Sequence, residues 1–151
     1  MKYSHEIVID LPREKVIELF DNQENAFKWM EGLESWDPIS GEQGKEGAKS
    51  KMVFKTKRGT MEMQEEITKY ELPERINFVY TAKGVTNWND NRFEPISDQQ
   101  TRWIQSNVFK CRGMVRLFAF LMPGAFKKQS LKFMNDFKNF AEKAAKETVS
   151  E

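Results

Sequence analysis

The spacing of apolar side chains changes once along this chain, and that change limits the possible folds more than any other feature. Between residues 49 and 110, apolar side chains recur at every second position, in segments separated by short turns such as Arg58-Gly59 and Lys83-Gly84. Alternation predicts strands with one buried face, and the short turns predict antiparallel pairing. Beyond residue 125 the spacing becomes helical, with one mostly apolar stripe formed by Phe126, Ser130, Phe133, Phe137, Phe140, Ala141 and Ala144. This stripe predicts an amphipathic helix of about 20 residues or more.

The first 32 residues predict a strand followed by two short helices. Residues 3–9 alternate, Pro12 suits the first turn of a helix, and Gly32 suits the end of the second helix. The predicted fold is therefore α+β, with an antiparallel sheet of about seven strands, two short helices after the first strand, and one long C-terminal helix. A single sheet must cover its apolar face, and the long helix is the only predicted element large enough to do so.

Composition sets limits on partners and location. The chain has 151 residues, which suits a single domain over residues 1–151, and its 24 basic and 23 acidic side chains leave no uniform basic field for nucleic acid. One cysteine, Cys111, and one histidine, His5, exclude an internal disulfide and a Cys/His zinc site, and we expect no metal and no cofactor. No signal-peptide segment is evident, and the longest apolar run, residues 114–122, is too short to span a membrane. We expect a cytoplasmic protein without stable membrane insertion.

Several stretches of the sequence resemble one known superfamily. They read EIVIDLPREKV (6–16), LPERI (72–76), NRFEP (91–95) with TRW (101–103), and LMPGAFKK (121–128). Over essentially its whole length the chain resembles bacterial-type members of the START-like, polyketide cyclase/dehydrase-like (SRPBCC) helix-grip superfamily. The resemblance implies a curved sheet wrapped around the long helix, with a cavity for an apolar or amphipathic small molecule. Members include ligand carriers, hormone and lipid binders, aromatic polyketide cyclases and chaperone-activating modules, so the resemblance does not select one function.

The alternation also predicts which side chains face inward and which lie opposite each other across the sheet. The predicted pairs are Phe93 with Trp103, Asn91 with Gln105, Asn89 with Asn107, Tyr80 with Asn87, and Glu65 with Tyr80. A buried amide without a partner costs about 1–3 kcal/mol, so this polar patch predicts a cavity that holds water or a ligand. The alternative is a register shifted by one residue, which would turn the Asn side to solvent and Trp88 inward.

The cavity is expected between the sheet and the C-terminal helix, lined by Met63, Tyr80, Trp103, Phe133 and Phe137. With the polar patch added, the candidate ligand-binding residues are Met63, Glu65, Tyr80, Asn87, Asn89, Trp103, Gln105, Asn107, Phe133 and Phe137.

Three ionisable or reactive side chains have two interpretations each. Glu65, the only charged side chain on its face, is either a carboxylate with a raised pKa that serves a ligand or a reaction, or a residue that reaches solvent or a cation. His5 is either a hydrogen-bonded core residue or part of an acid–base set with Glu65 and Tyr80. Cys111 is expected to be a small buried hydrophobe rather than a nucleophile.

Three classes of function fit these features. The first is a binding or carrier protein for a small apolar or amphipathic molecule. The second is a cyclase/dehydrase-like or hydrolase-like enzyme, and the third is a protein-interaction module. The apolar segment 114–122 is either a buried helical turn, a homodimer contact or a flap at the cavity mouth.

Overall fold

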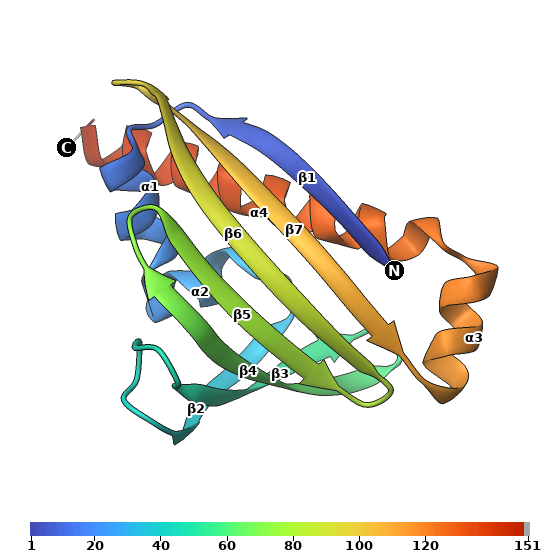
Figure 1. Ribbon diagram of the computed structural model, residues 1–151. Coiled ribbons are helices and arrows are strands. Elements are labelled where there is room, and N and C mark those ends of the chain that lie inside the picture. The colour runs from blue at the N-terminus through green and yellow to red at the C-terminus, as the bar shows by residue number, and fades with distance from the viewer. Residues whose placement is uncertain (150–151) are drawn as a thin grey trace.

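The computed structural model, which describes residues 1–149, contains one seven-stranded antiparallel sheet and four helices (Figure 1). The strands lie in the spatial order β1-β7-β6-β5-β4-β3-β2. Strands β2 to β7 are therefore each next to the strand that follows in sequence, and β1 pairs with β7 at the edge. In sequence the elements are β1 (Lys2–Ile9), α1 (Arg13–Phe20), α2 (Gln23–Trp29), β2 (Leu33–Ser40), β3 (Lys49–Thr56), β4 (Gly59–Glu71), β5 (Arg75–Ala82), β6 (Val85–Ser97), β7 (Gln100–Cys111), α3 (Gly113–Leu121) and α4 (Gly124–Val149).

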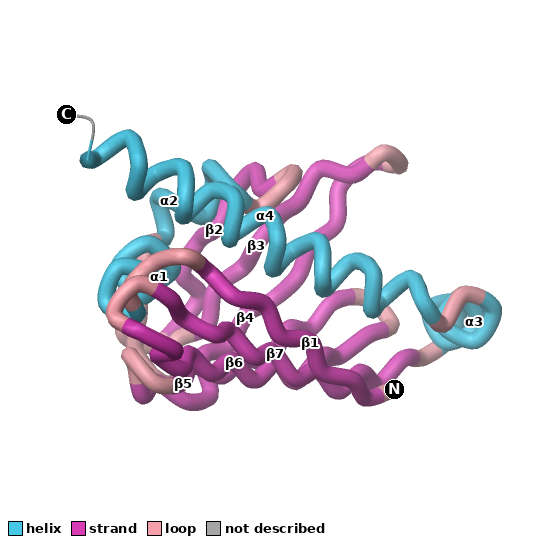
Figure 2. Tube along the Cα trace, turned by 90° about the horizontal axis from the view of Figure 1, so that it is seen from above, coloured by secondary structure: helices cyan, strands magenta, loops and turns pink. Residues whose placement is uncertain are grey.

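The sheet curves beneath the long helix α4, which crosses it from end to end (Figure 2). The short helices α1 and α2 lie at one end of α4, and α3 lies at the other (Figure 1). This arrangement confirms the predicted helix-grip fold, because the long amphipathic helix α4 covers the concave face of the sheet.

The two short helices form where the sequence predicts them, with one difference at the start of the first helix. Pro12 lies just before α1 rather than within it, and its backbone oxygen accepts the first helical hydrogen bonds. The side chain of Asn22 caps α2 by accepting from the backbone N–H of Asn25. Within α2 the buried aromatic is Trp29, whereas Phe27 is exposed.

The predicted strand register is correct. Phe93 lies opposite Trp103, and the other predicted pairs of this sheet are also formed. Trp88 lies on the outer face with 43% of its surface exposed, so the shifted register is excluded. The tight turns fix this register because a slip of one residue would exchange the two faces of each strand.

The core is densest where α1, α2 and the second half of α4 meet the sheet. There the ring of Phe20 makes edge contacts with Phe93, Trp103 and Phe137 at centroid distances of 5.2–5.5 Å. Trp103, Phe137, Met134 and Ala141 have no exposed surface. We call this part of the molecule the packed end.

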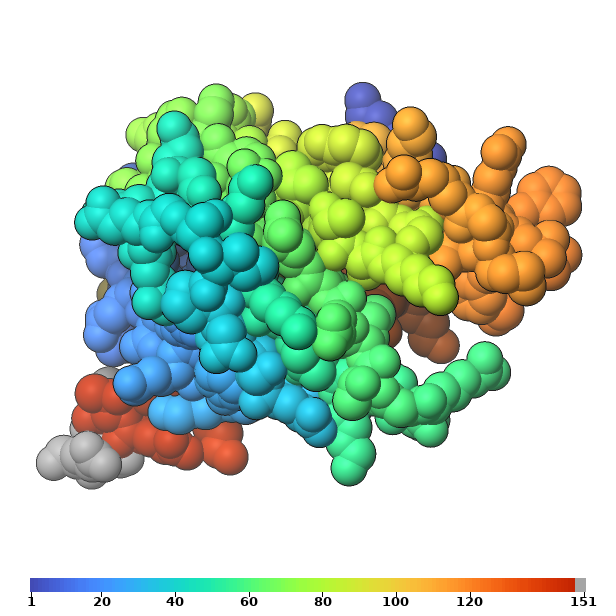
Figure 3. Space-filling model, turned by 90° about the horizontal axis from the view of Figure 1, so that it is seen from below, coloured from blue at the N-terminus to red at the C-terminus, as the bar shows by residue number. Residues whose placement is uncertain are grey.

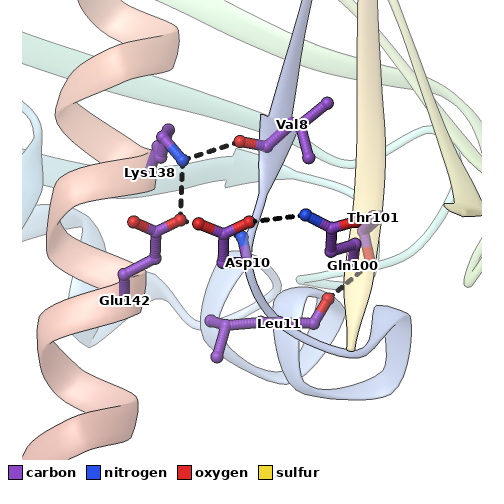
Figure 4. A network of polar contacts seen from close by, with 7 residues as sticks. All are labelled: Val8, Asp10, Leu11, Gln100, Thr101, Lys138 and Glu142. Atoms are coloured by element: carbon purple, nitrogen blue, oxygen red, sulfur yellow. Dashed lines mark hydrogen bonds and ion pairs between the residues drawn. The ribbon is translucent and has the colours of Figure 1, made fainter. Parts of the chain in front are cut away.

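A polar network fastens the packed end of α4 to β1 (Figure 4). Lys138 Nζ donates to the backbone oxygen of Val8 and to Glu142 Oε2, both at 2.7 Å. Glu142 Oε2 also accepts from the backbone N–H of Asp10 at 2.8 Å, and Asp10 Oδ1 accepts from Gln100 Nε2. These contacts fix where the second half of α4 lies on the sheet.

Most of the segment 114–122 lies in α3, which spans Gly113–Leu121, and the segment is not a buried turn. Within α3 no side chain is buried, and six residues from Met114 to Met122 are strongly exposed. None of the helices in residues 1–149 is long and apolar enough to cross a membrane.

Candidate functional site

A cavity of about 890 Å³ lies between the sheet and the first half of α4. Seen from below, the surface is hollowed between α3 and the β3–β4 hairpin, with α4 behind the hollow (Figure 3). The walls are mostly apolar and come from α2, five strands and α4. The apolar lining residues are Trp29, Met30, Met52, Phe54, Met61, Met63, Tyr80, Ala82, Val85, Phe109, Phe126 and Phe133.

The cavity exists because side chains of unequal length face each other across it. On α4, Phe126, Ser130 and Phe133 are only partly buried. Below them the strands present the short amides of Asn87 and Asn107. Short side chains on the sheet cannot reach the helix, so the space between the two layers stays open.

Hydrogen bonds from β1 hold the first half of α4 above this space. Tyr3 Oη donates to the backbone oxygen of Phe126 at 2.9 Å and lies 2.6 Å from Ser130 Oγ. His5 Nε2 lies 3.0 Å from the backbone oxygen of Lys127. His5 lines neither cavity described here, so it takes the structural role of a hydrogen-bonded residue between β1 and α4.

The inward amides of β6 and β7 form a ladder of hydrogen bonds. At its inner end Asn91 uses both halves of its amide: Nδ2 donates to Asn89 Oδ1 and to the backbone oxygen of Ile76, and Oδ1 accepts from Trp103 Nε1 and Gln105 Nε2. The distances run from 2.7 to 3.3 Å. Asn91 therefore has no unused hydrogen-bonding capacity.

The ladder continues toward the cavity and ends with an unused acceptor. Asn107 Oδ1 accepts from Asn89 Nδ2 at 2.8 Å and from Asn87 Nδ2 at 3.1 Å, and Asn107 Nδ2 donates to Gln105 Oε1 at 3.2 Å. Asn87 Oδ1 accepts no hydrogen bond from any residue in the described part of the chain. Because Asn87 lines the cavity, its carbonyl oxygen is available to a donor there.

A second, smaller cavity of about 250 Å³ lies deeper, between α2, the β2–β3 loop and the sheet. It shares a wall with the large cavity, formed by Trp29, Met30, Tyr80, Asn89, Gln105 and Phe133. Glu65 lines only this smaller cavity, together with Ser50, its neighbour across β3 and β4.

Glu65 is buried, with 3% of its surface exposed, and it has no cationic partner among residues 1–149. Tyr80 Oη donates to Glu65 Oε2 at 2.9 Å. Burial raises the pKa of Glu65 to about 7, although the hydrogen bond from Tyr80 acts in the opposite direction. Burial also raises the pKa of Tyr80 well above its usual value, so the phenol stays protonated. The alternative in which Glu65 reaches solvent or a cation is wrong.

Three of the five residues expected to line the large cavity do so: Met63, Tyr80 and Phe133. Trp103 and Phe137 line neither cavity, and this part of the expectation is wrong. They are enclosed by Phe20 and Phe93, because α1 covers the end of the sheet where they lie. Asn87, Asn89, Gln105 and Asn107 line the large cavity as expected.

Sequence reasoning missed Trp29, which stands in the wall between the two cavities. Its ring contacts Phe133 at 4.7 Å and Phe137 at 5.1 Å, and its buried Nε1 has no hydrogen-bond partner in residues 1–149. The signal was present in the sequence, since Trp29 follows Ala26 by three residues, as expected for the same face of a short helix.

The remaining candidate groups, namely Cys111, metal ligands and His5, form no further site in the described residues. Cys111 is half-buried at the end of β7 and lines neither cavity. In residues 1–149 no group of three or more His, Cys, Asp and Glu side chains could hold a metal ion. Glu65 and Tyr80 are in contact, but the ring of His5 bonds to the backbone of α4, lines neither cavity and does not join them.

Comparison with known proteins places this geometry in a family. The family model described as polyketide cyclase / dehydrase and lipid transport matches residues 1–142. A search of curated proteins found no match to the chain.

Solved structures share the fold at low sequence identity. A conserved protein from Geobacillus kaustophilus is similar with a TM-score of 0.81 and 18% identity, covering 95% of this chain and 97% of that one. Ara h 8.0201 is similar with a TM-score of 0.74 and 14% identity, covering 93% of this chain and 97% of that one. The ZhuI aromatase/cyclase from Streptomyces sp. R1128 is similar with a TM-score of 0.73 and 12% identity, covering 96% of this chain and 95% of that one. The chain belongs to the polyketide cyclase/dehydrase and lipid transport family, within the SRPBCC superfamily that its sequence resembles.

Proposed function

We propose that this protein binds and carries a small apolar or amphipathic molecule in the large cavity. The observation that supports this most strongly is an open space of about 890 Å³ with apolar walls and a few converging amides. Small-molecule sites typically have volumes of about 300–1,000 Å³ and this mixture of wall chemistry. The family description, which includes lipid transport, agrees with the proposal.

The walls and the ladder have different tasks in this proposal. Methionine and phenylalanine side chains supply apolar contact, and flexible methionines such as Met61 and Met63 adapt to ligands of different shape. The amide ladder orients a polar group of the ligand. A ligand hydroxyl or amine would donate to Asn87 Oδ1, the acceptor that the ladder leaves unused.

Two measurements test the proposal. Native mass spectrometry of freshly purified protein should detect a co-purifying small molecule, and a fluorescent fatty-acid-like probe should bind with one site per chain. Ala82→Phe should weaken probe binding, because Ala82 lines the cavity and the larger ring would fill it. Thr81→Phe is the matched control, because Thr81 is exposed on the opposite face of the same strand.

The proposal fails if no probe binds to a correctly folded protein. It also fails if Ala82→Phe and Thr81→Phe bind the probe as tightly as the unmodified protein does.

A second candidate function rests on Glu65. A carboxyl group with a pKa of about 7 can accept or donate a proton near neutral pH, and this one lines a cavity beside the Tyr80 hydroxyl. Such a pair suits removal of a proton next to a carbonyl group, a step that the words cyclase and dehydrase in the family description also suggest.

Hydrogen–deuterium exchange at the methyl group of acetophenone, followed by NMR, tests this second candidate. Exchange should accelerate with the protein and stop with Glu65→Gln. Glu62→Gln is the control, because Glu62 lies exposed on the same strand and pairs with Lys51. If exchange proceeds equally with Glu65→Gln, Glu65 is not the base.

A further inference from the structure

The helix α3 presents an apolar surface to solvent. Met114 is 77% exposed, Phe120 82% and Leu121 66%, and Leu117, Phe118 and Met122 are each about half exposed. A single exposed apolar residue is ordinary, but six within nine residues form a continuous patch. We call these six residues the α3 patch.

The orientation of α3 is fixed by its other side. Val115 packs so closely on Gly84, in the β5–β6 turn, that a Cβ there would lie 2.8 Å from Val115 Cγ2. The edge of Phe118 contacts the ring of Phe126 at 6.2 Å. Val115 and one edge of Phe118 therefore hold α3 on its inner side, and the rest of the α3 patch faces solvent at the end of the molecule away from α1 and α2 (Figure 1).

The stretch of chain that carries and flanks the patch is basic. Residues 99–135 contain seven Lys and Arg and no Asp or Glu. Arg102 and Lys132 form ion pairs with acidic residues elsewhere. The other five, all exposed, form no ion pair within residues 1–149; they are Lys110, Arg112, Arg116, Lys127 and Lys128.

We propose that the α3 patch docks the protein on the surface of an anionic lipid bilayer. Exposed apolar side chains flanked in the chain by basic ones without acidic partners are the combination that binds the interface of a membrane with anionic lipids. The apolar side chains would enter the boundary of headgroups and acyl chains, while the five cations would remain among the headgroups. Docking of this kind is peripheral and needs no membrane-spanning helix.

The α3 patch lies next to the large cavity. Phe126 touches Phe118 of the patch, lines the large cavity and lies 5.0 Å from Phe109, another lining residue. The hollow in Figure 3 lies directly beside α3. A bilayer bound through α3 would thus lie next to the cavity, although docking itself does not depend on what the cavity holds.

A second copy of the chain fits the patch less well. In a two-fold dimer the same surface meets itself, so the five unpaired cations of one copy would approach those of the other. Like charges would oppose that contact, whereas anionic headgroups neutralise them.

Co-sedimentation with vesicles tests the proposal, using protein without added ligand. The protein should bind vesicles of phosphatidylcholine mixed with phosphatidylglycerol, bind less as salt rises, and bind weakly to phosphatidylcholine alone. Lys127→Gln combined with Lys128→Gln should lower the partition coefficient about 25-fold, since each cation near an anionic surface contributes about fivefold. Phe120→Ser combined with Leu121→Ser should also remove binding.

Matched controls separate the patch from general charge and hydrophobicity. Lys143→Gln with Lys146→Gln removes two cations from the other end of α4, and Ile39→Ser removes an exposed apolar side chain from β2. Both should bind vesicles normally, and circular dichroism should show all variants folded. Equal binding by every protein, no binding by the unmodified one, or a dimer in sedimentation velocity that the α3 variants dissociate would overturn the proposal.

Discussion

The two halves of α4 carry the same kind of aromatic stripe but meet different surroundings. Phe137 and Ala141, in the second half, are completely buried, and the ring of Phe137 packs against Phe20 of α1 and Trp103 of β7. Phe126 and Phe133, in the first half, overhang the large cavity. A helix face of uniform character can therefore pack at one end and line a cavity at the other, because the elements opposite it determine which occurs.

The polar groups beneath α4 change in the same direction. Asn91, near the packed end, makes four hydrogen bonds and has none to offer. Asn87, near the open end, keeps a carbonyl oxygen without a donor in the described residues. From the packed end to the cavity, the amides thus change from having every hydrogen-bonding position occupied to having one acceptor unoccupied.

The largest expected difference between the two halves is in stability. Phe137→Ala should lower the free energy of unfolding by about 3–5 kcal/mol, because the removed ring leaves a hole in a close-packed core. Phe126→Ala should cost less than about half of that, since its ring already borders open space. Urea unfolding of both variants measures the difference, and equal losses would show that the two halves are packed alike.

The next effect concerns pH. The pKa of Glu65 is raised from 4.5 to about 7 in the folded protein, so the folded state binds this proton more tightly than the unfolded state. The resulting stabilisation is complete below the unfolded pKa and is lost as pH rises through about 7. The difference of about 2.5 pKa units corresponds to about 3 kcal/mol. Unfolding free energies measured from acid to alkaline pH should therefore fall across this window.

Glu65→Gln isolates that contribution, because glutamine cannot ionise and other groups titrate alike in both proteins. The decline between about pH 4.5 and 7 should be smaller in the variant by the amount attributed to Glu65. Parallel stability curves for the two proteins would mean that Glu65 is as well solvated as an ordinary surface carboxylate.

Asn107→Leu should have an intermediate effect. From the sequence alone, removal of one buried amide is expected to leave folding intact or even stabilise the empty protein. The structure reverses this expectation, because Asn107 Oδ1 accepts from Asn87 and Asn89, and its Nδ2 donates to Gln105. Leucine would leave those partners unpaired, at a cost of about 1–3 kcal/mol in unfolding free energy. A midpoint in urea at or above that of the unmodified protein would show that cavity water replaces these bonds.

The sequence predicted the fold and the inward register because both depend on local patterns. Tight turns and alternation suffice to place Asn89 opposite Asn107 and Phe93 opposite Trp103. Family resemblance and periodicity likewise predicted a long helix over the concave face.

The sequence did not show which inward residues line a cavity. Trp103 and Phe137 lie on the predicted faces, but α1 and α2 fold over them, and that packing joins segments far apart in the chain. The burial of Glu65 depends on the same cover, because the smaller cavity is closed by α2 and the β2–β3 loop. Alternation predicts which face of a strand a residue lies on, but not whether another element packs over that residue.

The smallest stability effect is expected at the open end of the ladder, where Asn87→Leu should cost little. Asn107 Oδ1 would still accept from Asn89, and no buried donor would lose its acceptor. Binding should change more than folding, because the variant lacks the free carbonyl oxygen that we propose for a ligand donor. A pyrene-labelled long-chain alcohol should bind about fivefold more weakly, as expected for one lost hydrogen bond of about 1 kcal/mol. The methyl ether of that alcohol has no hydroxyl to donate, so its affinity should not fall, and Asn139→Leu, an exposed change on α4, should affect neither probe. If Asn87→Leu weakens both probes equally, the residue acts through the shape of the wall, and the polar end of the ligand lies elsewhere in the cavity.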